Sequence, residues 1–331
     1  MKALNSEFIP IAEVDIYESL ILHLKYYKCG SFELYSNMVI PGLAYCYMDE
    51  FPGNNVGIVE SISIGNGVTY SGRLLKQLLS NKVIHKTKTF YKKTPEQIAK
   101  ALVAEFALQD IVIEEDKGLG TQITIQVTGE NLLEFCDKIL ETQDLGCEVI
   151  YDYVTNQKVF RVFEGADNTQ YAPLSTNFEN ITEYQYKSDV SNFKNFAYVA
   201  GEVQEGQPRT MVEVDMRKGD EEKRELWVDA RDLQSEVEND NGEMEPVSIE
   251  EYKNMLYQRG VEKLLEYNSE ESCVISPKID LTIGELRCFK DDETGIESEQ
   301  RVVELIYAKE GNSIKQDIVW GKQNIRRSVN V

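Results

Sequence analysis

The chain has 331 residues, 42% of them hydrophobic and 28% charged, a composition that is typical of folded proteins and argues against disorder. Its 35 Lys and Arg residues against 57 Asp and Glu residues give a formal net charge of -22, which disfavours a surface that grips nucleic-acid phosphates. At this length the chain can bury a sizeable core, in two or three domains.

The sequence contains no targeting or spanning signal that we recognise. No run of about 18 apolar residues could cross a bilayer, and residues 1–20 lack the basic, apolar and small-residue order of a secretion signal. We therefore expect no membrane segment and synthesis in the cytosol.

Residues 1–92 predict a first, barrel-like β domain made mostly of strands. Residues 57–64, GIVESISI, place Ile58, Ile62 and Ile64 on one face, and Asn66-Gly67 supplies the backbone angles of a two-residue hairpin turn. A helix is expected after Gly72, with an apolar face made of Leu74, Leu75, Leu78 and Leu79.

The same stretch nearly matches a phosphate-binding loop, because Gly67 and Gly72 are separated by four residues and Arg73 follows. Such a loop follows a buried strand and leads straight into a helix, whereas here the first glycine is used in a turn before another strand. Leu74 also lacks the hydroxyl that would hold magnesium. We interpret the stretch as strand, turn, strand and helix, with no cofactor.

Residues 93–165 predict a small α+β domain. Thr94, Pro95 and Gln97 form the start signal of a helix. Residues 121–127 alternate as a strand, and a second helix is expected to be capped by Thr128, with Leu132, Phe135, Cys136 and Ile139 inward. Residues 147–165 predict a hairpin that turns near Asn156, and the glycine-rich residues 116–120 favour a connecting turn over an anion site.

Residues 166–331 predict a second barrel-like β domain with a helical insertion at about residues 235–270. Residues 195–203, NFAYVAGEV, are apolar on both faces, so this strand is expected to lie centrally in a barrel or between subunits. Residues 210–233 predict a hairpin with a charged tip, and residues 235–246 an acidic loop. Ser248 begins a capping box for a helix to about residue 267, and the chain closes with a hairpin turning at Gly311-Asn312.

The sequence offers little for catalysis. Six cysteines include no C-x-x-C pair, and with only two histidines a zinc site or a disulfide framework is not favoured. Hydrolases of the Ser-His-Asp or Cys-His kind need a histidine to carry the proton. His23 lies in an apolar strand as a packed or interface residue, and His85 lies among lysines as a solvated connector. We expect no catalytic, cofactor-binding or metal-binding residues.

A carboxylate enzyme is harder to exclude, because glycosidases need only two acids and this chain has 57. The acidic residues 236–246 do not follow the spacing of a calcium loop. Tyr151 and Tyr153 could line a sugar site, although alternation in a hairpin explains them equally well. A carbohydrate-active or cell-wall-binding protein with paired acids is therefore the alternative hypothesis.

Several phrases, in this order, resemble the tail-hub (tail-associated or baseplate hub) proteins of long-tailed phages with flexible tails. They cover nearly the whole chain: residues 30–35 (GSFELY), 57–84, 158–170 (KVFRVFEGADNTQ), 175–202, 224–233 (RELWVDARDL) and 279–311. The pairing of SNFKNFAYVAGE with VDARDL is the most specific part.

The resemblance implies an α+β, mainly β, protein with two barrel-like β domains in each subunit. Three subunits would form a pseudo-sixfold ring at the virion tail tip, adapting the hexameric tail tube to a trimeric tip and letting DNA pass through the channel. The implied partners are further copies of the chain, a tail-tube or distal-tail protein, the end of the tape-measure protein, and a tail-tip or receptor-binding protein. Specific nucleic-acid binding and catalysis are not implied.

Two departures from the family pattern stand out. Many hub proteins carry a C-terminal peptidase, lysozyme or host-binding extension, whereas this chain ends ten residues after Gly321. Residues 282–285 read TIGE where the family has DLGD, a conservative change that keeps the turn plausible.

Overall fold

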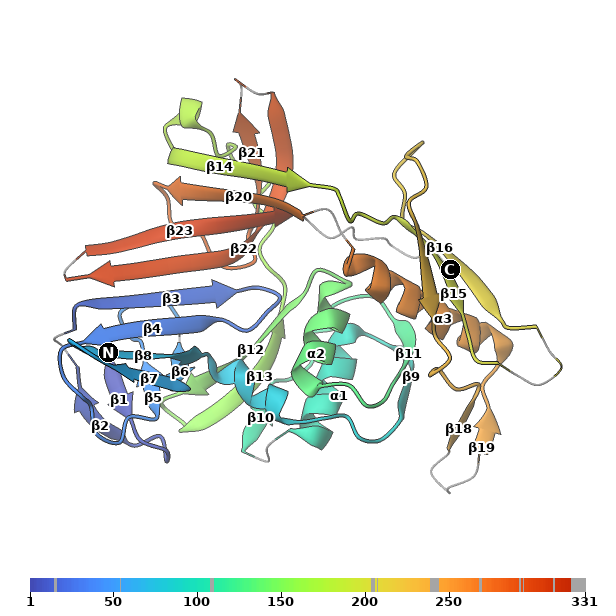
Figure 1. The fold of residues 1–331 in the computed structure, drawn as a ribbon, viewed down its shortest axis with the longest axis horizontal. Coiled ribbons are helices and arrows are strands. Elements are labelled where there is room, and N and C mark those ends of the chain that lie inside the picture. Colours follow the sequence, from blue (N-terminus) through green and yellow to red (C-terminus); the bar gives the residue numbers. More distant parts are fainter. Residues whose placement is uncertain are drawn as a thin grey trace.

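The computed structural model describes residues 1–322 except 15, 16, 54, 108, 109, 204, 205, 207, 239–243, 268, 269, 292, 294 and 312. Figure 1 shows a strand-rich part, a compact α+β part beside it, and a small sheet with one long helix at the far end. The mainly β, α+β class predicted from the sequence is confirmed.

The strand-rich part is built on one nine-stranded sheet. Eight strands follow one another in the order β14, β20, β23, β22, β3, β4, β8 and β7, and β21 pairs with β22. Their bounds are β3 (Ser19–Lys25), β4 (Ser31–Ser36), β7 (Ser61–Ile64), β8 (Val68–Arg73), β14 (Ile181–Asp189), β20 (Glu270–Pro277), β21 (Leu286–Asp291), β22 (Ile296–Glu310) and β23 (Ser313–Lys322).

The chain's two ends meet in this sheet, because β22 pairs antiparallel with β3, and Leu305 lies opposite Leu24. The predicted final hairpin is confirmed: β22 and β23 pair from Glu310 and Ser313 back to Lys322. Trp320, Phe289 and Leu22 are fully buried in the core beneath the sheet. The domain boundaries at residues 92 and 165 stay predictions. In the structure, strands from residues 1–92 and from residues 166–331 share this one sheet.

A second, four-stranded sheet covers the N-terminal side of this core. Its order is β2 (Pro10–Glu13), β1 (Lys2–Leu4), β5 (Tyr45–Tyr47) and β6 (Val56–Ile58). Residues 57–64 are thus two strands in two sheets, and not one strand with three isoleucines on a shared face. The break comes at Val59 and Glu60, whose amides donate to Ala44 of one layer and Ser71 of the other.

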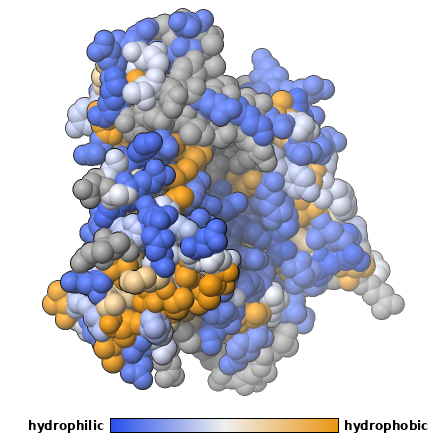
Figure 2. Space-filling model, turned by 60° about the vertical axis from the view of Figure 1, so that its left-hand side comes forward, coloured by the Kyte–Doolittle hydropathy of each residue, from blue (hydrophilic) through white to orange (hydrophobic). Residues whose placement is uncertain are grey.

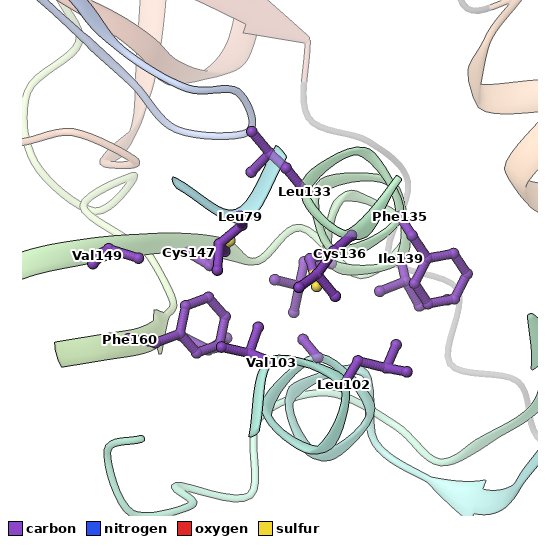
Figure 3. Packing of buried hydrophobic residues seen from close by; sticks show 14 of the residues in the cluster. Leu79, Leu102, Val103, Leu133, Phe135, Cys136, Ile139, Cys147, Val149 and Phe160 are labelled. Atoms are coloured by element: carbon purple, nitrogen blue, oxygen red, sulfur yellow. The ribbon is translucent and has the colours of Figure 1, made fainter. Parts of the chain in front are cut away.

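The α+β part contains three further strand pairs and two α-helices. Its elements are the 3-10 helix η1 (Leu75–Asn81), β9 (Lys88–Lys93), α1 (Pro95–Phe106), β10 (Ile111–Ile113), β11 (Ile123–Val127), α2 (Leu132–Glu141), β12 (Gly146–Asp152) and β13 (Gln157–Phe163). Figure 3 shows Phe135, Cys136 and Ile139 of α2 facing Leu102 and Val103 of α1. The capping box of Thr94 and Gln97 and the hairpin turn at Asn156 are confirmed.

The far end of the molecule is a three-stranded sheet on a helix. β15 (Phe196–Ala200) lies between β16 (Met211–Asp215) and β17 (Glu225–Asp229), with α3 (Ile249–Leu265) against one face. Ser248 caps α3 as predicted. β18 (Glu236–Glu238) and β19 (Met244–Pro246) form a ribbon from the ends of the predicted acidic loop, whose residues 239–243 lie outside the described part. A short 3-10 helix, η2 (Thr176–Phe178), precedes β14.

Four further local predictions are wrong. The first is the hairpin of residues 210–233: β16 and β17 do not pair with each other, because β15, whose side chains are apolar on both faces, lies between them. β15 pairs antiparallel with β16 and parallel with β17.

The cap of the second helix is Asn131, and not Thr128. Residues 129–132 run antiparallel to residues 82–84, held by hydrogen bonds from Gly129 to Ile84 and from Leu132 to Lys82. This pairing keeps the chain extended past Thr128, and the Asn131 side chain then accepts from the amides of Leu133 and Glu134.

The remaining two errors lie around Gly67 and Gly72. The turn has three residues, because Ile64 pairs with Val68 and the Gly65 amide donates to the Gly67 carbonyl. The predicted helix is a 3-10 helix that begins only at Leu75, because Gly72 and Arg73 continue strand β8.

Candidate functional site: the open edge of the main sheet

The glycine-rich stretch at 65–79 serves strand packing. A Cβ on Gly72 would lie 1.8 Å from the carbonyl oxygen of Ile58, so only glycine allows the two strands to approach. The Arg73 guanidinium donates to both carboxylate oxygens of Glu60, at 2.7 and 2.8 Å. The interpretation as strand and turn is confirmed.

The loop at 116–120 is a turn that the chain fills with its own anion. The amides of Lys117 and Leu119 donate to the Glu96 carboxylate at 2.9 and 2.7 Å, and the Lys100 ammonium donates to it at 2.7 Å. Burial acts to raise the pKa of Glu96, but these hydrogen bonds outweigh it and lower the pKa. The Lys117 and Leu119 amides and the Lys100 ammonium are therefore occupied by the chain's own carboxylate.

The two histidines lie where the sequence placed them. His23 in β3 lies 2.7 Å from Glu304 Oε1 of β22, and this bond contributes to lowering the pKa of Glu304 against the opposing effect of burial. His85 is exposed, with its ring edge-on to Phe106. Among the described residues no group of His, Cys, Asp and Glu is placed to hold a metal. Cys29, Cys46, Cys136, Cys147 and Cys288 are free thiols, and the side chain of Cys273 is not described.

The aromatic residues considered for a sugar site pack mainly against each other. Tyr151 is 3% exposed and stacks on Phe8 at 4.9 Å, so its ring face is not open to a ligand. Tyr153 is exposed and lies edge-on to Tyr151. A cavity of about 380 Å³ adjoins Tyr151, and two acids, Glu7 and Asp110, lie on its wall; Asp110 pairs with Lys158. Phe8 and Lys158 also line this cavity, and the Lys158 ammonium lies 4.5 Å from the Phe8 ring centre.

A buried polar cluster, which the sequence did not reveal, joins the main sheet to the α+β part. The Asp144 carboxylate, at the turn before β12, accepts hydrogen bonds from the Arg301 guanidinium of β22 and from the Tyr27 hydroxyl. Its backbone carbonyl accepts from the Tyr26 hydroxyl at 2.9 Å. Arg301 also donates to the carbonyl of Gly284 in the TIGE turn. Asp144 and Arg301 are 0% and 2% exposed, so four distant segments are fixed together out of water.

The main sheet ends in an open, apolar edge. In the described structure β7 pairs only with β8, and its outward Ile62 and Ile64 are 54% and 70% exposed. Figure 2 shows hydrophobic side chains gathering on the side of the molecule that carries the N-terminal strands. Other exposed apolar residues of these strands and their loops are Ile9, Ile11, Met38 and Val39. We call these six residues the N-terminal apolar patch.

At the opposite end of the sheet, β14 pairs only with β20 within the described structure. Edge strands present unpaired N–H and C=O groups and are ready templates for another strand. The sheet thus offers two open ends, of which the β7 end has the apolar side chains of a protein contact.

Comparison with known proteins identifies the family. Residues 68–321 match the model of the Siphovirus ReqiPepy6 Gp37-like proteins, which is more than half of the chain. The chain belongs to this family. A search of curated proteins gave no significant match.

The fold is that of prophage tail proteins. The 43 kDa tail protein of prophage MuSo2 from Shewanella oneidensis matches with a TM-score of 0.60 at 13% identity, covering 93% of this chain and 95% of that one. Tail protein gp18 of a Listeria monocytogenes EGD-e prophage matches with a TM-score of 0.61 at 12% identity, covering 99% and 95%. A tail protein of Neisseria meningitidis MC58 gives 0.54 at 13%, covering 93% of both chains. The resemblance to phage tail proteins inferred from the sequence is confirmed. None of the described helices is long and apolar enough to cross a membrane.

Proposed function

We propose that this protein is a structural hub at the distal end of a phage or phage-like tail. Three copies form a ring with pseudo-sixfold symmetry that joins the hexameric tail tube to a trimeric tip. The ring lies at the tail tip of the virion, and it contacts the tail-tube or distal-tail protein, the tape-measure end and the tip or receptor-binding protein. The protein has no enzymatic role.

The observation that carries the proposal is the open sheet edge at β7 with the N-terminal apolar patch, in a chain with the fold of tail proteins. Contiguous exposed apolar residues on soluble chains mark protein contacts. An edge strand with two outward isoleucines is an aggregation hazard unless a partner covers it. In a closed ring each copy's edge is covered by its neighbour, so no free edge remains from which an aggregate could grow.

The charge supports DNA passage through the ring. With a net charge of -22 per copy, three copies carry three times -22, or -66, around one channel. A negatively charged wall repels phosphates, so DNA slides past without being held.

The test is the solution mass by light scattering on a sizing column, over a range of concentrations. The proposal expects about three times the 37.9 kDa chain mass, and a central channel in electron micrographs. Ile62→Asp with Ile64→Asp places charge on the edge and should give monomers. Val154→Asp is the control, because Val154 is 94% exposed on the turn between β12 and β13 and is not part of β7, and it should leave the mass unchanged.

A persistent monomer is compatible with the proposal only if adding the tail-tube or distal-tail partner triggers assembly. Without that response the hub role is wrong, and turnover on peptidoglycan and host polysaccharides becomes the next measurement. Turnover abolished by one Asp or Glu substitution would establish the alternative, a carbohydrate-active or wall-binding protein.

A further inference from the structure

The three-stranded sheet β16-β15-β17 has one face packed on α3, and its opposite face carries exposed residues on β16 and β17, whereas Phe196 and Ala200 of β15 are buried. Ala197, Val199, Val214 and Val228 lie in the core with α3. Side chains alternate along strands, so the opposite face carries the residues between them. We call this the outer face: Phe196, Tyr198, Ala200, Met211, Glu213, Asp215, Glu225, Trp227 and Asp229.

The strand register places the aromatic residues of the outer face side by side. Tyr198 lies between Glu213 of β16 and Trp227 of β17. Trp227 is 58% exposed and Met211 is 49% exposed. Trp227 is the middle residue of edge strand β17, and tryptophan is enriched among the residues that dominate the binding energy of protein interfaces. The sequence pattern of β15, apolar on both faces, agrees with a second covering layer.

At its two ends, the outer face already binds the chain's own cations. The Lys223 ammonium lies 3.8 Å above the Phe196 ring centre. Arg209 donates to the Ala200 carbonyl at 2.8 Å and to Asp229 at 2.7 Å. Arg217 pairs with Asp215 at 2.8 Å. Asp215 and Asp229 are therefore neutralised, and the Phe196 ring is capped by a cation.

Two further carboxylates lie on this face: Glu213 in one row with Tyr198 and Trp227, and Glu225 opposite Phe196. Among the described residues neither Glu213 nor Glu225 forms an ion pair, and both are exposed. Glu225 accepts only the Tyr198 hydroxyl, at 3.5 Å. The charges of Glu225 and, more weakly, Glu213 raise the pKa of Tyr198, so the potential at this point is negative. Trp227 thus lies in a field that attracts cations, and tryptophan is the best aromatic face for a cation–π contact.

We propose that the outer face docks a basic segment of another protein, with an Arg or Lys side chain over the row of Tyr198 and Trp227, flanked by Glu213 of β16 and Glu225 of β17. Charge complementarity decides the class of partner. A second copy brings another net charge of -22, and nucleic acid or an acidic glycan is repelled by the same carboxylates. A basic segment would place a cation on Trp227 and its neighbouring carboxylates, as Lys223 lies on the Phe196 ring and Arg209 pairs with Asp229 at the ends of the face. This docking does not require the ring, so either proposal can fail while the other holds.

Tryptophan emission provides a direct assay, because the chain has two tryptophans and Trp320 is fully buried. The probe is the peptide acetyl-Gly-Arg-Gly-Arg-Gly-amide, and its neutral control carries citrulline in place of both arginines. We expect a saturable change in emission with the arginine peptide that weakens as salt increases, and none with the citrulline peptide. The change should be absent in Trp227→Phe, where calorimetry should also show weaker binding.

The double variant Glu213→Gln with Glu225→Gln should weaken arginine-peptide binding by about tenfold, the effect of roughly 1.4 kcal/mol. Glu33→Gln with Glu134→Gln removes the same charge from exposed positions elsewhere and should bind like the wild type. Unchanged circular dichroism and unchanged Trp320 emission show that each variant is folded.

Four results would each overturn the docking proposal. These are no emission change with the arginine peptide, equal binding of the citrulline peptide, wild-type affinity in the Glu213→Gln, Glu225→Gln variant, or a response to triacetylchitotriose in place of the peptide. The last result would make the face a sugar platform. Loss of the trimer on Trp227→Ala would instead assign the face to contacts between copies.

Discussion

The buried pair of Asp144 and Arg301 gives the sharpest stability prediction. Asp144→Ala leaves the Arg301 guanidinium in a site where it is 2% exposed, with its hydrogen bond to the Gly284 carbonyl but without its carboxylate partner. It also removes the acceptor of the Tyr27 hydroxyl. Removing one partner of a buried pair costs about 3–5 kcal/mol. At about 2 °C per kcal/mol for a chain of this size, the melting temperature should fall by roughly 6–10 °C.

A double-mutant cycle tests the physical cause. Asp144→Ala with Arg301→Met removes both charges, so it should cost no more than Asp144→Ala alone, with a coupling energy of about 2–3 kcal/mol. Arg231→Met is the control, because Arg231 is 65% exposed in its pair with Asp229 and should cost under about 1 kcal/mol. Additive single-mutant costs would refute the argument that the penalty comes from an uncompensated buried charge.

Three further predictions concern local structure. Burial raises the pKa of Glu262 to about 7 from 4.5, so this group's contribution to stability is most favourable below pH 4.5 and declines as pH rises to 7. Glu262→Gln should therefore be more stable than the wild type by roughly 2–3 kcal/mol at pH 8 and by little at pH 4.5, as measured by urea unfolding. Gly72→Ala should strongly lower the melting temperature, because the added Cβ would meet the Ile58 carbonyl oxygen. Gly65→Ala should change the melting temperature little, because nothing lies within 4 Å of its added Cβ. Equal effects of the two substitutions would contradict the close approach of the strands at Gly72. Asn131→Ala should cost about 1 kcal/mol and Thr128→Ala under about 0.5, and the reverse order would restore Thr128 as the cap of α2.

Local signals predicted the elements whose partners are near in sequence. The Thr94 capping box, the Asn156 turn and the final hairpin depend on side-chain and backbone contacts within a few residues, and all three are confirmed. The predictions failed where a distant segment takes the hydrogen bonds. β15 inserts between β16 and β17, and residues 82–84 hold the chain extended past Thr128.

The candidate surfaces were only partly visible in the sequence. The apolar pattern of β15 indicated a strand covered on both faces, but it did not show that α3 covers one face while Trp227 and Met211 lie exposed on the other. The isoleucines of β7 were expected to share a face with Ile58, whereas Ile58 packs on the core and Ile62 and Ile64 are exposed. Alternation identifies two faces of a strand, but the edge position that leaves one of them open comes from the order of strands in the sheet.

The two proposed surfaces should respond to salt in opposite directions. At the β7 edge the contact residues Ile62 and Ile64 are apolar, and Glu60 is neutralised by Arg73 at 2.7 Å. Copies with a net charge of -22 repel each other, and salt screens this repulsion, so the trimer should strengthen between 50 and 500 mM NaCl. At the outer face the attraction between Glu213, Glu225 and a cation is itself electrostatic, so peptide binding should weaken over the same range. Light scattering and Trp227 emission measure the two effects on one sample. If salt dissociated the trimer, ion pairs rather than apolar contacts would hold the copies together, and the β7 edge would not be their main contact.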